Sequence, residues 1–169
     1  ERFRVIVFHR VVYTESVARY IARAKALDRV IIFETDDLVY DPKYLHLMDY
    51  YTKMNSLEKK LYENGVGGEI LADSYVEYAT TSTTFLKRKL EERGKKVFLV
   101  TNKMCEEDVA WALEIRKSTR KDDSLVKISY LSGTPSHNKD FATITGALTR
   151  ILSEFPQARL VLAGPLDMD

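Results

Sequence analysis

The fold is decided by residues 3–33, FRVIVFHRVVYTESVARYIARAKALDRVIIF. Apolar runs occupy 3–8 and 30–33, and such runs are typical of strands that are buried on both faces, as in a parallel sheet. Between them Thr14 is a good N-cap, and apolar residues then recur at helical spacing, at Val17, Ile21, Ala24 and Leu27. Strand, helix and strand within about 30 residues form a βαβ unit with a right-handed crossover. The sequence therefore predicts an α/β fold with a parallel sheet.

The alternation of strands and helices continues along the chain. We expect further strands at 75–80, 97–100, 126–131 and 159–163, and two or three helices between 44 and 73. We also expect a helix that begins after Ser82 or Thr83 and ends at Gly94, one at 106–120, and a strongly amphipathic one that ends before Pro156. The polar run KSTRKDDS, at 117–124, predicts a linker between domains at 1–122 and 123–169.

Composition excludes several classes of protein. The chain has 169 residues, 45% of them apolar, and 26 Lys+Arg stand against 25 Asp+Glu, so it has material for a core and is not mainly disordered. A net charge of +1 gives no broad positive field, so we expect no nucleic-acid partner. Cys105 has no partner for an intrachain disulfide, no Cys/His set has zinc spacing, and no apolar run approaches the roughly 20 residues of a membrane span. These features predict a soluble, cytoplasmic protein.

Ligands of open α/β sheets bind beyond the carboxyl ends of the strands, where this sequence has three polar loops. The loop SGTPSHNK, at 132–139, leads into a strong helix, whose free N–H groups and dipole favour a phosphate. Gly133 lets the backbone approach a ligand, Thr134 and His137 offer polar side chains, and Lys139 adds a cation. This set fits a diphosphate. The alternative is simple helix capping, because the loop has neither a G-x-G-x-x-G nor a Walker sequence.

The other two loops carry acidic and basic residues. Asp36 and Asp37 follow the second strand, where a carboxylate can act as a general base, bind a hydroxyl-rich substrate or hold a metal ion. The alternative for this pair is capping of the turn before Pro42. His9 and Arg10 follow the first strand and can contact an anionic substrate, although a histidine there can also be held by a hydrogen bond alone.

Basic residues gather in and after the helix that begins near 83, at Lys87, Arg88, Lys89, Arg93, Lys95 and Lys96. Glu91 and Glu92 lie among them, which favours an ordinary solvated surface. The alternative is attraction to an anionic lipid leaflet, which leaves open a peripheral contact with the inner face of a membrane.

Two long stretches resemble the GT-B glycosyltransferases, in particular the retaining group that uses nucleotide-sugar donors. ADSYVEYATTSTTFLKRKLEERGKKVFLVTNKM, at 72–104, is similar to the end of that family's N-terminal domain. ISYLSGTPSHNKDFATITGALTRILSEFPQARLVLAGP, at 128–165, is similar to the first βαβ unit of its donor-binding domain, with Gly133 and Lys139 at the family's separation. The resemblance implies a Rossmann-like parallel sheet with helices on both faces, in parts of the two GT-B domains.

The resemblance also implies roles for single residues. Lys139 matches the lysine that contacts the donor diphosphate, whereas Thr134 stands where many members have an arginine. Asp36 occupies the place of a histidine in a histidine–aspartate pair that faces the acceptor, which implies catalytic, acceptor-side roles for Asp36 and Asp37. Members of this fold generally use no metal. The resemblance further implies a central fragment, lacking strands before Glu1 and the rest of the donor domain, and therefore inactive by itself.

The expected function is transfer of a sugar from a nucleotide-sugar donor to a hydroxyl acceptor in polysaccharide or glycolipid synthesis. Asp36 and Asp37 are the expected catalytic residues. The expected substrate-binding residues are His9, Gly133, Thr134, His137 and Lys139. We expect neither a metal nor a separate cofactor, and no oligomeric state is predicted. The alternative is a non-catalytic α/β module that binds a phosphate or nucleotide, or serves as a scaffold.

Overall fold

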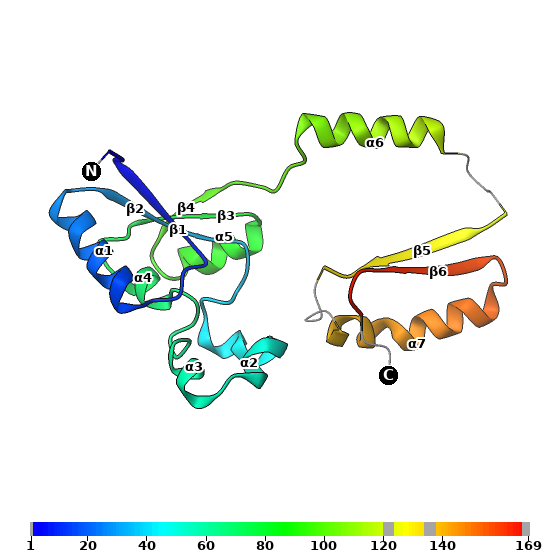
Figure 1. The fold of residues 1–169 in the computed structure, drawn as a ribbon, viewed down its shortest axis with the longest axis horizontal. Coiled ribbons are helices and arrows are strands. Elements are labelled where there is room, and N and C mark those ends of the chain that lie inside the picture. The colour runs from blue at the N-terminus through cyan, green and yellow to red at the C-terminus, as the bar shows by residue number, and fades with distance from the viewer. Residues whose placement is uncertain (1, 120–123, 134–137, 167–169) are drawn as a thin grey trace. The chain divides into compact units, whose positions relative to one another are not determined.

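The structure, a computed structural model, describes residues 2–119, 124–133 and 138–166 (Figure 1). It is an α/β protein with parallel strands flanked by helices, which confirms the predicted fold class. The chain forms two compact units, Glu1–Lys103 and Met104–Asp169, and each has its own parallel sheet. The predicted domain boundary between 122 and 123 lies outside the described residues and stays a prediction.

The first unit is built on a four-stranded parallel sheet in the order β1-β2-β3-β4. Its strands are β1 (Val5–His9), β2 (Val30–Thr35), β3 (Tyr78–Thr81) and β4 (Lys96–Leu99). Its helices are α1 (Glu15–Ala26), the 3₁₀ helix η1 (Pro42–Leu47), α2 (Asp49–Lys53), α3 (Ser56–Lys60), α4 (Gly68–Ala72) and α5 (Thr84–Glu91). The strands and helices predicted for this part of the chain are therefore present.

Threonine side chains explain where two of these helices begin. The Thr14 hydroxyl accepts a hydrogen bond from the Val17 N–H at 3.3 Å, and the Thr83 hydroxyl accepts one from the Leu86 N–H at 3.2 Å. Each bond satisfies an N–H group that the first turn of a helix leaves without a backbone partner. Both N-caps agree with the sequence prediction.

The core of the first unit is organised by one row of residues across the sheet. Phe8, Phe33, Ala79 and Val97 are partners in register on the four successive strands, and all are buried. Buried residues of α1, α4 and α5 join the same cluster, at Ile21, Ala24, Ile70, Leu71 and Leu90. These helices therefore share one face of the sheet.

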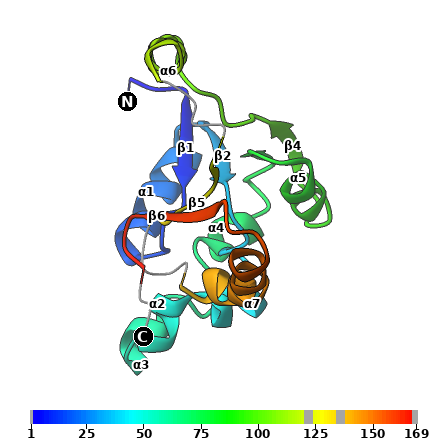
Figure 2. The same ribbon diagram turned by 90° about the vertical axis from the view of Figure 1, so that its right-hand side faces the viewer.

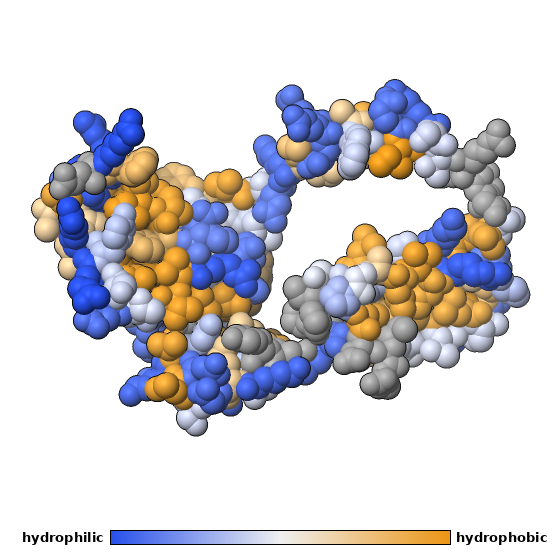
Figure 3. All heavy atoms as spheres, viewed as in Figure 1, coloured by the Kyte–Doolittle hydropathy of each residue, from blue (hydrophilic) through white to orange (hydrophobic). Residues whose placement is uncertain are grey.

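The opposite face of this sheet exposes apolar side chains. Val5 and Val7 are each 49% exposed and Phe98 is 56% exposed, although such residues in a parallel sheet are usually covered. The strand order explains this. When parallel strands follow one another in sequence with right-handed crossovers, every crossover lies on the same side. The described helices of this unit that enter the core cluster thus cover one face of the sheet. Figure 3 shows apolar surface, in orange, on the first unit.

The second unit contains the amphipathic helix predicted from the sequence. The parallel strands β5 (Val126–Leu131) and β6 (Ala158–Ala163) are joined by α7 (Asn138–Glu154). Phe141 and Leu148 are the buried residues of α7, and the Phe141 ring lies 4.8 Å from the Tyr130 ring, centroid to centroid. The periodicity of apolar residues therefore predicted this helix, but of its apolar face only Phe141 and Leu148 are buried, whereas Ile144, Ile151 and Phe155 are exposed.

The helix α6 (Glu106–Ser118) precedes these strands and has no buried residue. Its apolar side chains are all exposed, Trp111 among them. Across the described ranges, every helix is too short or too polar to cross a lipid bilayer.

Candidate functional site

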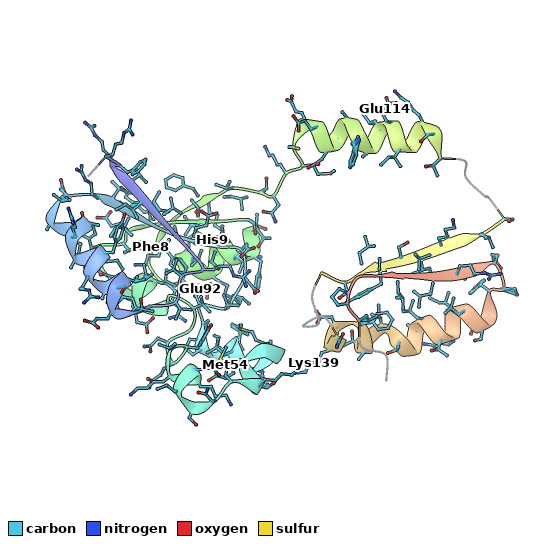
Figure 4. The ribbon with its side chains drawn as sticks, viewed as in Figure 1. Phe8, His9, Met54, Glu92, Glu114 and Lys139 are labelled. Carbon is cyan, nitrogen blue, oxygen red and sulfur yellow. The ribbon has the colours of Figure 1, made fainter. Side chains whose placement is uncertain are left out.

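The carboxyl ends of β1 and β2 bring together polar residues that the sequence places in separate loops. His9 and Glu34 are register partners at these ends, and His9 Nδ1 lies 3.9 Å from Glu34 Oε1. His9 is labelled in Figure 4. The parallel arrangement thus places His9 next to an acid, and the Asp36–Asp37 pair follows directly after the same strand.

Arg10 connects the two strand ends. Its guanidinium lies 3.4 Å from Asp36 Oδ1 and 4.0 Å from Asp37 Oδ2, and its backbone N–H donates to the Glu34 carbonyl at 3.4 Å. Arg10 has φ +49°, in the left-handed region that non-glycine residues rarely adopt. The sequence suggested that Arg10 contacts an anionic substrate, but in the structure it faces the two aspartates. Arg10 and the aspartates follow two neighbouring parallel strands. In the sequence, only this position after the strands pointed to the contact.

The two aspartates differ in their surroundings. Asp37 Oδ1 accepts a hydrogen bond from the Leu38 N–H at 2.6 Å, and the Thr35 hydroxyl donates to the Asp37 carbonyl at 2.7 Å. The buried Thr81 hydroxyl in turn donates to the Thr35 carbonyl at 2.6 Å. Asp37 therefore takes part in the turn, as the capping alternative predicts. Asp36 Oδ1 accepts a hydrogen bond from the Arg10 guanidinium at 3.4 Å. A carboxylate has further acceptor sites, with which Asp36 can bind a hydroxyl group of a ligand.

Hydrogen bonds join the residues that follow β5 in the second unit to the end of β6. The Ser132 N–H donates to the Ala163 carbonyl at 2.7 Å, and the Ser132 hydroxyl donates to the Pro165 carbonyl at 2.6 Å. Gly164 has φ +90°, and a Cβ there would lie 1.8 Å from the Ser132 carbonyl oxygen, so only glycine fits. The Ser132 hydroxyl is thus engaged within the protein.

Gly133 follows Ser132 and is exposed. Apart from its chain neighbours, no atom of the described residues lies within 4 Å of a Cβ added at Gly133. Lys139 lies in the first turn of α7 with an exposed side chain (Figure 4). Thr134 and His137, predicted to bind the donor, lie outside the described residues. Their roles stay predictions.

Asp73, in the stretch that resembles the GT-B N-terminal domain, has a structural role. It is the C-cap of α4, and its carboxylate accepts hydrogen bonds from the Lys25 ammonium and from the Tyr75 N–H. Burial by itself would raise the pKa of Asp73, but these bonds outweigh burial and lower it. Lys95 donates to the Asp73 carbonyl at 3.1 Å and to the Val76 carbonyl at 2.7 Å, and burial lowers the pKa of this amine. The hydrogen bonds of Asp73 and Lys95 therefore join α1, α4 and the segments before β3 and β4.

A hollow of about 620 Å³ lies beside this network, lined by Tyr40, Pro42, Asn64, Gly68, Glu69, Leu71, Ala72, Asp73, Arg93 and Lys95. Its cationic groups are engaged, since Arg93 binds Asp41 at 2.9 Å and Lys95 binds the two carbonyls. Burial raises the pKa of Tyr40 to about 12, against the opposing effect of Arg93, so its phenol is neutral near pH 7. Because these charges are satisfied internally, the hollow is a weaker candidate than the strand ends.

The basic run at 87–96 is largely neutralised by acids. Lys87 pairs with Glu91 at 3.7 Å, Lys89 with Glu92 at 2.9 Å, and Lys96 with Glu77 at 3.2 Å. These pairs favour the solvated-surface interpretation of this run over attraction to anionic lipid.

Within the ranges that the structure describes, no three His, Cys, Asp or Glu side chains gather as ligands for a metal ion. Comparisons of the chain with known protein families, with curated proteins and with solved structures find no match.

Proposed function

We propose that this chain belongs to an enzyme that transfers a sugar from a nucleotide-sugar donor to a hydroxyl acceptor. The proposal rests on the resemblance of 72–104 and 128–165 to the GT-B glycosyltransferases, and on two parallel α/β units whose strands end in polar groups. In this reaction the leaving group is a nucleoside diphosphate, whose developing charge must be neutralised.

The observation that carries the proposal is that the exposed Gly133 follows the carboxyl end of β5 and that Lys139 lies in the first turn of α7. Backbone N–H groups at the start of a helix and the helix dipole attract phosphate. The exposed Lys139 ammonium in the first turn adds a full positive charge.

The acceptor would bind at the carboxyl ends of β1 and β2. Asp36 can accept a hydrogen bond from an acceptor hydroxyl, and its contact with Arg10 at 3.4 Å holds its side chain in place for binding and orienting that hydroxyl. His9 pairs in register with Glu34 at the same edge of the sheet, and Asp37 lies 4.0 Å from the Arg10 guanidinium that also contacts Asp36. Since Asp37 is also bonded into the turn, we assign Asp36 the larger part in acceptor binding.

The test is thermal denaturation of the chain with UDP, GDP and ADP at millimolar concentration. At least one nucleotide should raise the melting temperature, and Lys139→Ala should abolish that rise. The control is Lys127→Ala, which removes an exposed lysine from β5 of the same unit and should keep the rise.

A chain that no nucleotide stabilises would be explained by the alternative, a scaffold module in which the loop only starts the helix. Equal stabilisation of the Lys139→Ala variant would place nucleotide binding elsewhere and contradict the assignment of this loop.

A further inference from the structure

The hollow beside Asp73 in the first unit has the size of a small-molecule site. Its volume is about 620 Å³, and such sites usually measure roughly 300–1,000 Å³. Its walls come from α4 and its flanking residues, from the start of η1 and from the turn between α5 and β4. Both ribbon views draw α4 beside the sheet, with α2 and α3 farther from the strands (Figure 1 and Figure 2). None of His9, Asp36 and Asp37, which are proposed to bind the acceptor, lines this hollow, so it is a separate place in the unit.

Hydrogen bonds between distant segments hold these walls in place. The Val66 N–H donates to the Val39 carbonyl at 2.8 Å, which joins the segment before α4 to the segment after β2. The Arg93 guanidinium donates to Asp41 at 2.9 Å and so joins the turn after α5 to the residue before η1. The hollow is therefore already formed in the single chain, as is usual for small-molecule sites.

The charges of the lining do not favour an ionic ligand. Two acids, Glu69 and Asp73, and two bases, Arg93 and Lys95, line the hollow, so their formal charges cancel. Arg93 is paired with Asp41, and Lys95 donates to two backbone carbonyls. An anion would have to compete with these internal acceptors, so the lining is better suited to a neutral ligand.

Two polar groups of the lining have no hydrogen-bond partner within the described part of the chain, and they differ in kind. Glu69 Oε2 is buried without a partner, although the Asn64 amide donates to Glu69 Oε1 at 3.0 Å. Tyr40 is 3% exposed, and its hydroxyl makes no hydrogen bond to a described residue. A buried polar group without a partner costs free energy, so a ligand that supplies both partners would be stabilised here.

Only some ligands can supply partners of both kinds. The Glu69 carboxylate accepts hydrogen bonds, whereas the Tyr40 phenol can donate one. An ammonium ion only donates and a fully ionised phosphate only accepts, but a hydroxyl group does both. We propose that the hollow binds a neutral ring compound with several hydroxyl groups, such as a sugar or a cyclitol. Its hydroxyls would bind Glu69 and Tyr40, and its C–H groups would pack against Pro42, Leu71 and Ala72. This inference does not depend on the proposed transfer reaction.

NMR titration of the whole chain with methyl α-D-glucopyranoside and with myo-inositol tests the proposal. At least one of the two probes should shift the amide signals of Gly68, Glu69 and Ala72 until the shifts saturate, and these shifts give the Kd. The amide signals of β5 and α7 should not move, because these elements belong to the other unit.

Tyr40→Phe and Glu69→Gln each remove one hydrogen bond to the ligand and keep the shape of the side chain. Each should raise the Kd by about threefold to tenfold. The matched controls are Tyr44→Phe and Glu63→Gln, which make the same chemical changes at residues that do not line the hollow. The controls should bind the probe as the unsubstituted chain does.

Three results would overturn the proposal. The first is that neither probe shifts the amides of α4 in the unsubstituted chain, a result that does not depend on how the variants fold. The second is an unchanged Kd in both Tyr40→Phe and Glu69→Gln. The third is that inorganic phosphate or ethylammonium shifts the same amides more strongly than either probe, since the hollow would then be a site for an ion.

Discussion

Arg10 and Asp36 are 26 residues apart in the sequence and lie 3.4 Å apart at the ends of neighbouring parallel strands. The contact exists because β1 and β2 are paired in register up to His9 and Glu34, so the residues that follow each strand emerge at the same edge. Arg10 makes this contact from a left-handed backbone conformation. Such backbone strain is found often at functional sites, and Asp28, in the turn after α1, has a similar φ of +52°.

Substitutions at Arg10 separate the strain from the ion pair. Arg10→Ala keeps the left-handed backbone and loses the exposed pair, so it should lower the free energy of unfolding by at most about 1 kcal/mol. Arg10→Gly loses the same pair but relieves the strain, and should be about 1 kcal/mol more stable than Arg10→Ala. Urea denaturation of the three proteins measures this order, and an alanine variant more stable than the glycine variant would contradict it.

Acidification should weaken the first unit through Asp41. Burial by itself would raise the pKa of this carboxyl, but the Lys43 backbone N–H and the Arg93 guanidinium outweigh it and lower the pKa. A carboxyl with a lowered folded pKa contributes stability above its unfolded pKa of about 4, and that stability is lost as pH falls through the folded value. Asp41→Asn should flatten the decline in melting temperature between about pH 5 and pH 2. If the melting temperatures of the two proteins fell in parallel with pH, Asp41 would have no part in the loss of stability.

Tyr40 should make the chain less stable at alkaline pH, whereas Asp41 does so at acidic pH. Burial raises its folded pKa to about 12, so its contribution to stability is complete below its unfolded pKa of about 10 and is lost as pH rises toward 12. Tyr40→Phe keeps the ring that lies edge-on to Phe33 and removes the ionisable group. The stability of the unsubstituted chain relative to this variant should therefore fall above about pH 10, as measured by urea denaturation at each pH. A constant difference would contradict the prediction.

The two glycines at the ends of β5 and β6 should respond differently to substitution. Gly164→Ala places a methyl group against the Ser132 carbonyl in a strained backbone conformation, so it should unfold the second unit or strongly lower its melting temperature. Gly133→Val meets no described atom within 4 Å apart from those of its chain neighbours, and it should leave the melting temperature within about 2 °C of the original value.

The same Gly133→Val variant tests the proposed phosphate site, since its side chain would occupy the space offered to the ligand. It should lose the stabilisation by nucleotides that the Lys127→Ala control retains. A Gly133→Val variant that still responds to nucleotides would show that this space is not used.

The sequence by itself determined the order and the type of most secondary-structure elements. The apolar runs before His9 and Glu34 predicted β1 and β2, Thr14 and Thr83 marked helix starts, and the spacing of apolar residues predicted the helix α7. These features depend on residues within one or two turns of each other, so a linear pattern contains them.

Only the tertiary structure decided which polar groups meet. Asp41 binds Arg93 across 52 residues, Asp73 holds Lys25 across 48, and Arg10 faces Asp36 and Asp37 rather than open solvent. Strand order likewise decided that the apolar runs of β1 and β2 would each expose one side. The sequence shows which polar residues follow a strand. Which of them come into contact depends on strand register and crossover direction, and these depend on the whole sheet.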